Sequence, residues 1–282
     1  MSDSTLHNKF DEMKRLIGEM ERVAIAFSGG ADSAFVLKVA RDVLGAENVL
    51  AVTGRSDSLA SRELDGATRL ARDLGVEHVV LDTNEFQNPD YLANPHNRCY
   101  FCKVTLYSEI ERFIRQRGIT QIASGTNADD LSDWRPGLQA AKEHSVRSPA
   151  AEAGLTKQEI RLLSRELGLP TFDKPASPCL SSRVPYGEEI TPQKLRMIDA
   201  AERCLQDHGF RECRVRHHGD LARIEVPVDA IPRLIEPTVS KAVDSRLREI
   251  GYAHVTVDLR GFRSGSLNEV IAFGQRQAPV QK

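Results

Sequence analysis

Apolar residues recur at two different spacings along the first half of the chain. Five of them follow one face of a helix, which predicts an amphipathic helix: Phe10, Met13, Leu16, Ile17 and Met20. The run 23–27 is apolar throughout, as expected of a strand buried on both faces of a parallel sheet. Further helices are predicted at 33–44, 59–74 and 103–116, and further strands at 48–53, 78–82 and 121–124. This alternation predicts a doubly wound α/β domain with ligands at the carboxyl ends of its strands.

The second half of the chain has a different pattern. A helix is predicted at 156–167, where Thr156 and Glu159 are spaced as a capping box. The stretch 168–190 is rich in Pro, Ser and Gly, which indicates a long functional loop. Beyond it we predict helices at 192–207 and 230–250 and strands near 214, near 224 and at 254–259. We therefore expect two domains, an α/β domain at 1–185 and a smaller α+β domain at 186–282.

Composition and charge narrow the classes of function. The 282 residues are 40% apolar and 28% charged, with a net charge of −2, so the chain is not expected to coat nucleic acid or anionic lipid. No apolar run approaches the roughly 20 residues of a membrane helix, and residues 1–5 lack the features of a signal peptide. We therefore expect the cytoplasm. The five cysteines indicate thiols used for chemistry or metal binding rather than a disulfide framework.

A glycine-containing loop separates the first predicted strand from the helix that follows it. Gly29 and Gly30 allow backbone amides to turn toward an anion, and the helix adds its positive N-terminal end. Ser28 and Ser33 carry hydroxyls for phosphate oxygens, and Asp32 carries a carboxylate for Mg²⁺. The alternative is an ordinary Gly-Gly turn with a serine N-cap. The strand, the helix and the two serines together favour a phosphate site.

A second polar segment follows the strand predicted at 121–124. Its sequence from Ser124 to Asp130 is Ser-Gly-Thr-Asn-Ala-Asp-Asp. Because the strands are parallel, this segment and the first loop should face the same crevice. A simple polar turn is the alternative. We predict instead that Gly125, Thr126 and Asp129 contact nucleotide or metal.

Three cysteines in two loops are candidate ligands or reactive thiols. Cys99 and Cys102 have a spacing that lets two thiolates meet one metal centre, beside Arg98 and Lys103, which should favour the thiolate form. Cys179 lies in a loop stiffened by two prolines. Three thiolates would suit an iron–sulfur cluster with one open iron. Zinc would normally require a fourth ligand, for which His96 is available, so both metals stay open at this point.

The first loop resembles the pyrophosphate-loop signature of the N-type ATP pyrophosphatases, Ser-Gly-Gly-x-Asp-Ser. It is not a Walker loop, because no lysine follows the glycines. The resemblance implies that ATP and Mg²⁺ are bound at Ser28–Ser33, with Asp32 catalytic. It also implies that ATP is cut between its α- and β-phosphates, so that AMP is transferred to the substrate and pyrophosphate is released.

Four motifs together resemble the LarE-type ATP-dependent sulfur transferases, which make the nickel-pincer nucleotide of lactate racemase. They are the loop at 28–33, Asn-Arg-Cys-Tyr-x-Cys-Lys at 97–103, Gly-Thr-Asn-x-Asp-Asp at 125–130 and Lys-Pro-Ala-x-Pro-Cys-Leu-x-Ser-Arg at 174–183. The resemblance implies that the carboxylates of a pyridinium mononucleotide dicarboxylate are adenylylated and that an oxygen of each is replaced by sulfur. It further implies a homo-oligomer whose C-terminal domain serves substrate binding and oligomerisation.

The family uses two sources of sulfur, and the cysteines of this chain bear on the choice. In one branch the cysteine that matches Cys179 donates its own sulfur and becomes dehydroalanine. In the other branch three cysteines hold a [4Fe-4S] cluster that delivers an additional sulfide. The presence of Cys99 and Cys102 beside Cys179 favours the cluster branch. By resemblance all three cysteines are metal ligands and catalytic.

Charged residues of the predicted strand near 214 are candidates for substrate binding. Arg214 and Arg216 point to one face of a strand, which suits bidentate contact with a phosphate or carboxylate. A solvated surface is the alternative. The resemblance favours ligand contacts for Arg183 and Arg214 and a site-edge or metal role for Glu225.

Two other functions compete with the nucleotide sulfur transferase. A tRNA thiolase could combine the same loop with three cluster cysteines, but a net charge of −2 disfavours binding to a phosphate backbone. A non-catalytic zinc module is disfavoured by the intact loop at 28–33. No role is assigned to Cys213, His217 or His218, and Cys204 is expected to be a packed thiol on an apolar helix face.

Overall fold

The computed structural model describes residues 3–132 and 136–263. These residues divide into two compact units, Met1–Ser177 and Pro178–Lys282. The division falls before residue 185, so the segment that carries Cys179 and Arg183 packs with the C-terminal unit. Trp134, for which the sequence allows either ring stacking or packing, lies outside the described residues.

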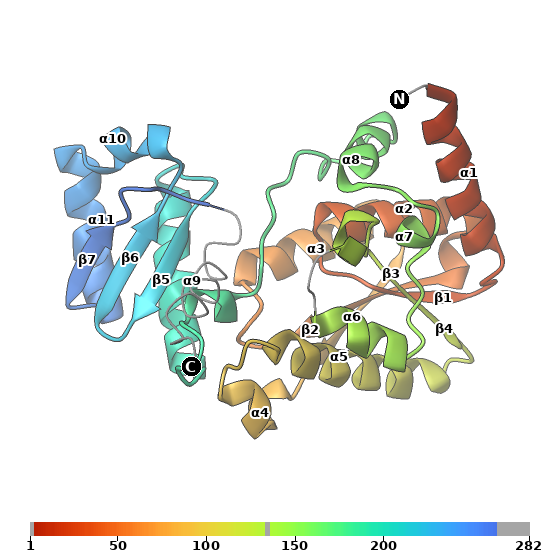
Figure 1. Cartoon of the computed structure of the whole chain (residues 1–282), viewed down its shortest axis with the longest axis horizontal. Coiled ribbons are helices and arrows are strands. Elements are labelled where there is room, and N and C mark those ends of the chain that lie inside the picture. The colour runs from red at the N-terminus through yellow and green to blue at the C-terminus, as the bar shows by residue number, and fades with distance from the viewer. Residues whose placement is uncertain (1–2, 133–135, 264–282) are drawn as a thin grey trace, which may run out of the picture. The chain divides into compact units, whose positions relative to one another are not determined.

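A four-stranded parallel sheet forms the centre of the first unit. Its strands are β1 (Val23–Ala26), β2 (Val49–Arg55), β3 (Glu77–Asp82) and β4 (Gln121–Ser124), in the order β3-β2-β1-β4 (Figure 1). The longer helices are α1 (Asp3–Gly18), α2 (Ala31–Leu44), α3 (Ser61–Asp73), α5 (Arg98–Arg115), α6 (Pro136–Glu143) and α8 (Lys157–Glu166), and α4 (Pro89–Leu92) and α7 (Pro149–Glu152) are single turns. The structure thus confirms the predicted doubly wound α/β fold.

Alternation along the strands gives each face of the sheet its own apolar core. On β1, Val23 and Ile25 pack with residues of α1, α2, α3 and α8, whereas Ala24 packs with Leu50, Val52 and residues of α5 and α6. Figure 1 shows α1 and α2 on one side of the sheet and α5 and α6 on the other. Burial on both faces explains why β1 appears in the sequence as a continuous apolar run.

The capping box at the start of α8 is present as predicted. Thr156 Oγ1 accepts a hydrogen bond from the Glu159 amide at 3.3 Å, and the Glu159 carboxylate accepts one from the Thr156 amide at 2.8 Å. Lys9 of α1 forms an ion pair with Glu159 at 2.8 Å. The cap therefore also ties the first helix of the chain to α8.

The order of the strands creates a topological switch point beside β1. The chain moves from β1 to β2 and β3 on one side and returns to β4 on the other. The loops that follow β1 and β4 therefore leave the sheet in opposite directions from adjacent strand ends, which is where open α/β sheets bind ligands. Both predicted polar loops, at 28–33 and 124–130, lie at this point.

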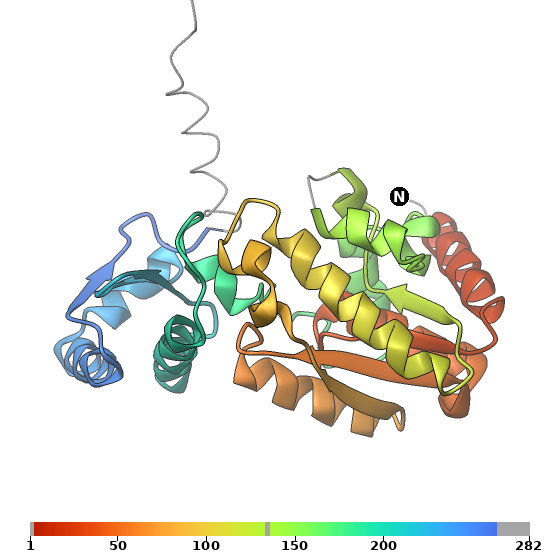
Figure 2. The ribbon, with the colours of Figure 1, turned by 90° about the horizontal axis from the view of Figure 1, so that it is seen from below.

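The C-terminal unit is a small mixed sheet with helices. Its strands are β5 (Arg214–His218), β6 (Leu221–Glu225) and β7 (His254–Val257), with β5 antiparallel and β7 parallel to β6. Its helices are α9 (Pro192–Asp207), α10 (Ile231–Leu234) and α11 (Pro237–Ile250). Figure 2 shows the same elements from a second direction. The core contains Leu205, Val215 and Leu247, and Cys204 is buried in it as predicted.

One predicted helix is interrupted. The sequence predicts a continuous helix over 230–250, but the structure breaks it between α10 and α11. Pro237 restricts the residue before it to extended geometry, and Glu236 has φ −54° and ψ 136°. Apart from this break, the predicted elements of the unit are observed. Within the described residues, no helix has both the length and the apolar composition needed to cross a membrane.

Candidate active site

The loop after β1 gathers two hydroxyls at the start of α2. Ser28 Oγ lies 3.0 Å from Ser33 Oγ, and the Gly30 amide donates to Ser28 Oγ at 3.4 Å. Gly30 is the N-cap residue of α2, and no side chain forms a cap hydrogen bond there. The structure therefore does not show the alternative of a serine N-cap. The hydroxyls and the helix N-terminus form one polar face suited to phosphate oxygens.

Gly29 fixes the path of this loop. Its φ is +70°, a left-handed angle that other residues resist. A Cβ atom at this position would lie 2.9 Å from Ala67 Cβ and 3.0 Å from Ala67 Cα on α3. The loop consequently rests directly on the backbone of a neighbouring helix, and only glycine permits that approach.

Gly125 brings the second loop against the first. A Cβ atom on Gly125 would lie 2.6 Å from the Ser33 amide nitrogen and 2.8 Å from Ser33 Cα. This contact between two backbones shows that the loops after β1 and β4 lie against each other. It also gives Gly125 a packing role besides the predicted contact with nucleotide.

Asp32 has one carboxylate oxygen without a hydrogen-bond partner within the described structure. Oδ1 is buried and unpaired, whereas Oδ2 accepts a hydrogen bond from the side-chain nitrogen Nδ2 of Asn127 at 3.5 Å. Burial raises the pKa of Asp32, Asp130 raises it further, and Lys157 and Arg161 oppose the rise. A half-buried, poorly compensated carboxylate beside two loops predicted to bind the nucleotide is a suitable ligand for Mg²⁺.

The segment after β4 is organised by Asn127, a residue that our sequence analysis did not single out. Asn127 is 1% exposed, and its Oδ1 accepts from the amides of Asp129 and Asp130 at 3.0 and 3.2 Å. Asp129 Oδ2 accepts from the Lys157 amide at 2.9 Å, and Thr126 Oγ1 lies 3.0 Å from Ser124 Oγ. Thr126 and Asp129 thus shape the loop, and their predicted contacts with nucleotide stay predictions.

Cys99 and Cys102 lie on the first turns of α5. Cys99 is exposed and Cys102 is partly exposed, and a separation of three residues places them on one side of the helix. Arg98 is buried and donates to Asn94 Oδ1 at 2.7 Å, while the Lys103 ammonium lies 5.6 Å from the centre of the Tyr107 ring. The pair is accessible to a metal or to a substrate.

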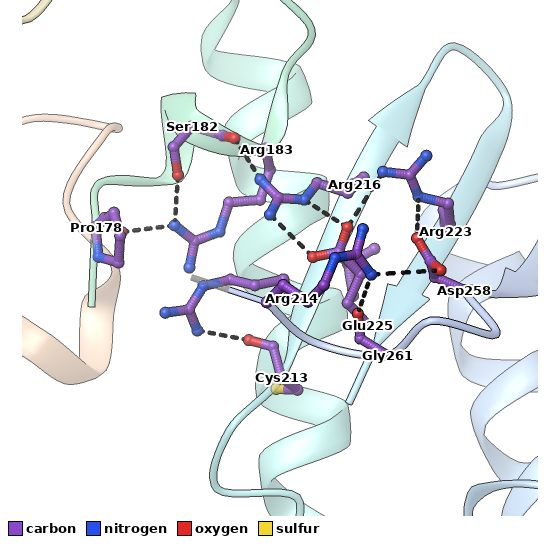
Figure 3. A network of polar contacts seen from close by, with 12 residues as sticks. Pro178, Ser182, Arg183, Cys213, Arg214, Arg216, Arg223, Glu225, Asp258 and Gly261 are labelled. Carbon is purple, nitrogen blue, oxygen red and sulfur yellow. Dashed lines mark hydrogen bonds and ion pairs between the residues drawn. The ribbon is translucent and has the colours of Figure 1, made fainter. Parts of the chain in front are cut away.

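The Cys179 segment is held by a buried ion pair. Arg183 is 1% exposed and forms a bidentate pair with Glu202 of α9, at 2.8 and 2.9 Å. Its Nη1 donates to the Pro178 carbonyl at 2.6 Å (Figure 3). The same atom donates to the Cys179 carbonyl at 3.0 Å. Cys179 itself is partly exposed. The guanidinium therefore positions the backbone on which the thiol is mounted, and direct contact with a cofactor would require Arg183 to leave Glu202.

The sequence did not predict a structural role for Glu202, because its partners are distant in sequence. Besides Arg183, its Oε1 accepts from the Val215 amide of β5 at 3.0 Å. Burial lowers the pKa of Arg183, but the ion pair with Glu202 overcomes this and leaves the pKa above its usual value. A glutamate in the middle of an amphipathic helix would be expected on the solvent face, and only its 5% exposure reveals its role.

Arg216 and Glu225 form a second buried pair on adjacent strands. The Arg216 guanidinium donates to both carboxylate oxygens at 3.0 and 2.9 Å, and Arg223 adds a contact at 3.1 Å (Figure 3). Arg216 Nη1 also donates to the Ser182 carbonyl at 2.7 Å. A metal role for Glu225, as the sequence suggested, would require one of these arginines to move away.

Arg214 lies on the same strand in a more electropositive environment. It is 8% exposed, its Nη1 donates to the Cys213 carbonyl at 2.6 Å, and its guanidinium carbon lies 5.1 Å from the centre of the Phe262 ring. Burial lowers the pKa of Arg214, and the positive charges of Arg183 and Arg216 lower it further, against the opposing effect of Glu202. A bound anion would relieve this unfavourable environment.

The metal ligands expected from the sequence lie in different units. Cys99 and Cys102 belong to the first unit and Cys179 to the second. Among residues 3–132 and 136–263, no three His, Cys, Asp or Glu side chains are grouped as a metal site. The cysteine pair on α5 suits two thiolate contacts to one metal, and the three-cysteine set stays a prediction.

Comparison with known proteins points to one enzyme family. A model of the NAD synthase family matches residues 10–91, which include the loop at 28–33. A pyridinium-3,5-bisthiocarboxylic acid mononucleotide synthase from Lactiplantibacillus plantarum is 37% identical over 96% of this chain and 98% of its own length. An uncharacterized protein from Synechocystis is 46% identical over 94% of this chain and 99% of its own length.

A more distant similarity covers only part of the chain. A tRNA-specific 2-thiouridylase from Rickettsia conorii is 27% identical over 58% of this chain and 54% of its own length. The first two relatives, in contrast, match the chain over nearly all of their sequences.

Replacing Gly29 should be more damaging than a matched glycine replacement. Gly75 has nearly the same backbone angle, φ +67° against +70°, but a Cβ there would meet nothing within 4 Å. We expect Gly75→Ala to lower the free energy of unfolding by about 1–2 kcal/mol, the cost of a left-handed alanine. Gly29→Ala should cost more, because it also meets Ala67, and should weaken ATP binding. Equal losses in chemical denaturation would contradict the role of the close contact.

Proposed function

Because the chain belongs to the family of the pyridinium-3,5-bisthiocarboxylic acid mononucleotide synthases, we propose that it adenylylates the carboxylates of a pyridinium mononucleotide with ATP and then replaces an oxygen of each by sulfur. It is an ATP-dependent sulfurtransferase of the pyrophosphate-loop class. We propose that it acts in the cytoplasm, in the biosynthesis of a nickel-pincer nucleotide. It is proposed to be a homo-oligomer and to have no nucleic-acid substrate.

The observation that carries the proposal is the close approach of the loops after β1 and β4 and the polar groups that they bring together. The groups are the hydroxyls of Ser28 and Ser33, the N-terminus of α2, and a carboxylate, Asp32, with one unpaired oxygen. These groups suit a nucleotide whose phosphates are bridged by Mg²⁺. With no lysine in the loop, the ATP is proposed to react at its α-phosphate and release pyrophosphate.

Adenylylation has a clear chemical purpose. A carboxylate oxygen is a poor leaving group, and transfer of the AMP group of ATP onto it, with release of pyrophosphate, turns it into a good one. A sulfur nucleophile then attacks the acyl carbon and AMP departs. In this proposal Asp32 holds Mg²⁺ against the phosphates, and Arg214 holds an anionic group of the pyridinium nucleotide.

The C-terminal unit supports the proposed contact of Arg214 with substrate. Its guanidinium is stacked on Phe262 in a region where two further arginines lower its pKa. The neighbouring arginines, Arg183 and Arg216, are each bound to a buried carboxylate. An anionic substrate bound at Arg214 would offset the effects of burial and of the neighbouring arginines on its pKa.

Three cysteines are the proposed ligands of a [4Fe-4S] cluster, namely Cys99, Cys102 and Cys179. The pair on α5, of which Cys99 is exposed and Cys102 partly exposed, supports two of the ligands, and the loop fixed by Arg183 presents the third. Such a cluster would supply sulfide from a source other than the protein's own cysteine. The competing account is that Cys179 donates its sulfur directly.

Substitution of Asp32 should separate activity from stability. Wild-type protein should convert ATP to AMP and pyrophosphate in the presence of the pyridinium dicarboxylate. Asp32→Asn should reduce this Mg²⁺-dependent rate by about 100-fold or more, a loss of roughly 3 kcal/mol in transition-state stabilisation. Formation of ADP and phosphate by the wild type would contradict the proposed chemistry.

The same variant should be more stable than the wild type without ligands at pH 7. A raised pKa means that ionised Asp32 destabilises the folded state, and this penalty develops as pH rises from 3.8 through the raised pKa. Asp42 on the same helix is the control, because its pKa is shifted in the opposite direction. Burial raises the pKa of Asp42, but hydrogen bonds from Lys38 and Arg41 outweigh this effect and lower it. Asp42→Asn should lose stability at pH 7. Urea denaturation at pH 4 and pH 7 measures both effects.

Loss of Arg214 should affect the two substrates differently. Arg214→Ala should weaken binding of the pyridinium nucleotide by about 1.5–3 kcal/mol, or roughly 10- to 150-fold, while the KM for ATP changes little. Arg211→Ala, which removes an exposed arginine from the same unit, is the control. If Arg214→Ala raised both KM values equally, a structural role would replace the proposed contact.

The sulfur source can be read from the protein after turnover. With cluster delivery, anaerobically purified protein should contain iron and sulfide, and mass spectrometry should find Cys179 intact. Cys99→Ser should then abolish iron binding and activity together. Conversion of Cys179 to dehydroalanine in a single turnover, in protein that lacks iron, would instead establish direct donation. The buried Cys204→Ser variant is a control that removes a thiol without removing a proposed ligand.

A further inference from the structure

Lys174 contacts the pyrophosphate loop, although it lies far from the loop in sequence. Its ammonium donates to the Gly29 carbonyl at 2.9 Å and to Glu63 Oε2 at 2.7 Å. The Lys174 and Glu63 side chains are 25% and 20% exposed, respectively. The lysine thus brings a positive charge directly to a loop that contains no cation of its own.

Two helices hold Lys174 in this place. Arg161 of α8 donates to the Lys174 carbonyl at 2.9 Å and fixes its backbone. Glu63 of α3 lies one turn before Ala67, the residue on which Gly29 rests. The turn of α3 that supports the loop therefore also carries the carboxylate that holds the ammonium beside it.

An ordinary surface ion pair accounts for only part of this geometry. A surface ion pair would require only the contact between Lys174 and Glu63. Lys174 also donates to the Gly29 carbonyl within the proposed anion-binding loop. An ammonium group has three N–H donors, and the contacts to Glu63 and Gly29 use two of them. The third donor can serve a phosphate oxygen beside the loop without loss of the other contacts.

The chemistry of the loop creates a need for such a cation. Cleavage of ATP at the α-phosphate releases pyrophosphate, on which several negative charges gather. The loop offers hydroxyls, amides and a helix N-terminus, and its only charged side chain, Asp32, is negative. Mg²⁺ bound at Asp32 would compensate part of the charge, and an ammonium at the loop would compensate more as the charge develops.

We propose that Lys174 is a catalytic residue that binds the pyrophosphate portion of ATP and stabilises pyrophosphate as it leaves. This inference rests on the proposed function. A substrate carboxylate oxygen forms a bond to the α-phosphorus, and the bond from that phosphorus to the oxygen bridging to the β-phosphate breaks. The electron pair stays on the pyrophosphate oxygen, whose negative charge the Lys174 ammonium stabilises. No proton has to be transferred in this step.

Binding of inorganic pyrophosphate and of AMP, each with Mg²⁺, tests the role of Lys174 by isothermal titration. Lys174→Gln should weaken pyrophosphate binding about tenfold, equivalent to about 1.4 kcal/mol, and change AMP binding by less than about twofold. Lys174→Arg should restore most of the affinity because it keeps the charge. Thermal unfolding of each variant establishes that it is folded.

Glu63→Gln is the matched control. It breaks the same ion pair but leaves the ammonium in place, so it should preserve or strengthen pyrophosphate binding. Equal weakening by Lys174→Gln and Glu63→Gln would show that the pair is only structural and would overturn the inference. Unchanged pyrophosphate binding in Lys174→Gln would overturn it as well. Wild-type protein that binds neither probe would contradict the proposed function itself.

Discussion

The close approach of two backbones at the switch point of the sheet sets the geometry of the first unit. Gly125, directly after β4, lies against the first turn of α2 so closely that a side chain would meet the Ser33 amide. Because β1 and β4 are adjacent and parallel, this contact fixes the two loops relative to one another. The positions of Ser28, Asp32 and Asn127 follow from it. The arrangement of the proposed phosphate site is thus mainly a consequence of backbone packing, to which the side chains add their chemistry.

Charge is arranged differently in the two units. In the first unit Asp32 keeps one oxygen unpaired, which is unfavourable for the folded protein alone and favourable once a cation binds. In the second unit, the buried carboxylates Glu202 and Glu225 each neutralise an arginine. Buried ion pairs of this kind contribute little net stability, but the loss of one partner is costly. The pair of Arg183 with Glu202 holds the guanidinium that donates to the Pro178 and Cys179 carbonyls.

The sequence was sufficient where structure depends on local patterns. The apolar run of β1, the capping box at Thr156 and the Ser-Gly-Gly loop were all predicted, because periodicity and turn chemistry are properties of neighbouring residues. The break before Pro237 was missed, although proline gave a local signal for it. The partners of Arg183 could not be predicted, because Glu202 reaches it through the packing of α9. The same holds for Lys174 and Gly29, whose contact depends on how α3 and α8 pack.

A long-range contact of this kind also gives the sequence motifs a physical connection. The motif at 174–183 begins with a lysine that donates to the Gly29 carbonyl and includes the cysteine proposed to act on the activated substrate. In the proposed reaction the two residues would serve different steps, Lys174 while pyrophosphate leaves and Cys179 afterwards. The stretch between them contains two prolines, which limit the conformations of the backbone. The motif therefore spans the boundary between the two units, with Lys174 in the first unit and Cys179 and Arg183 in the second.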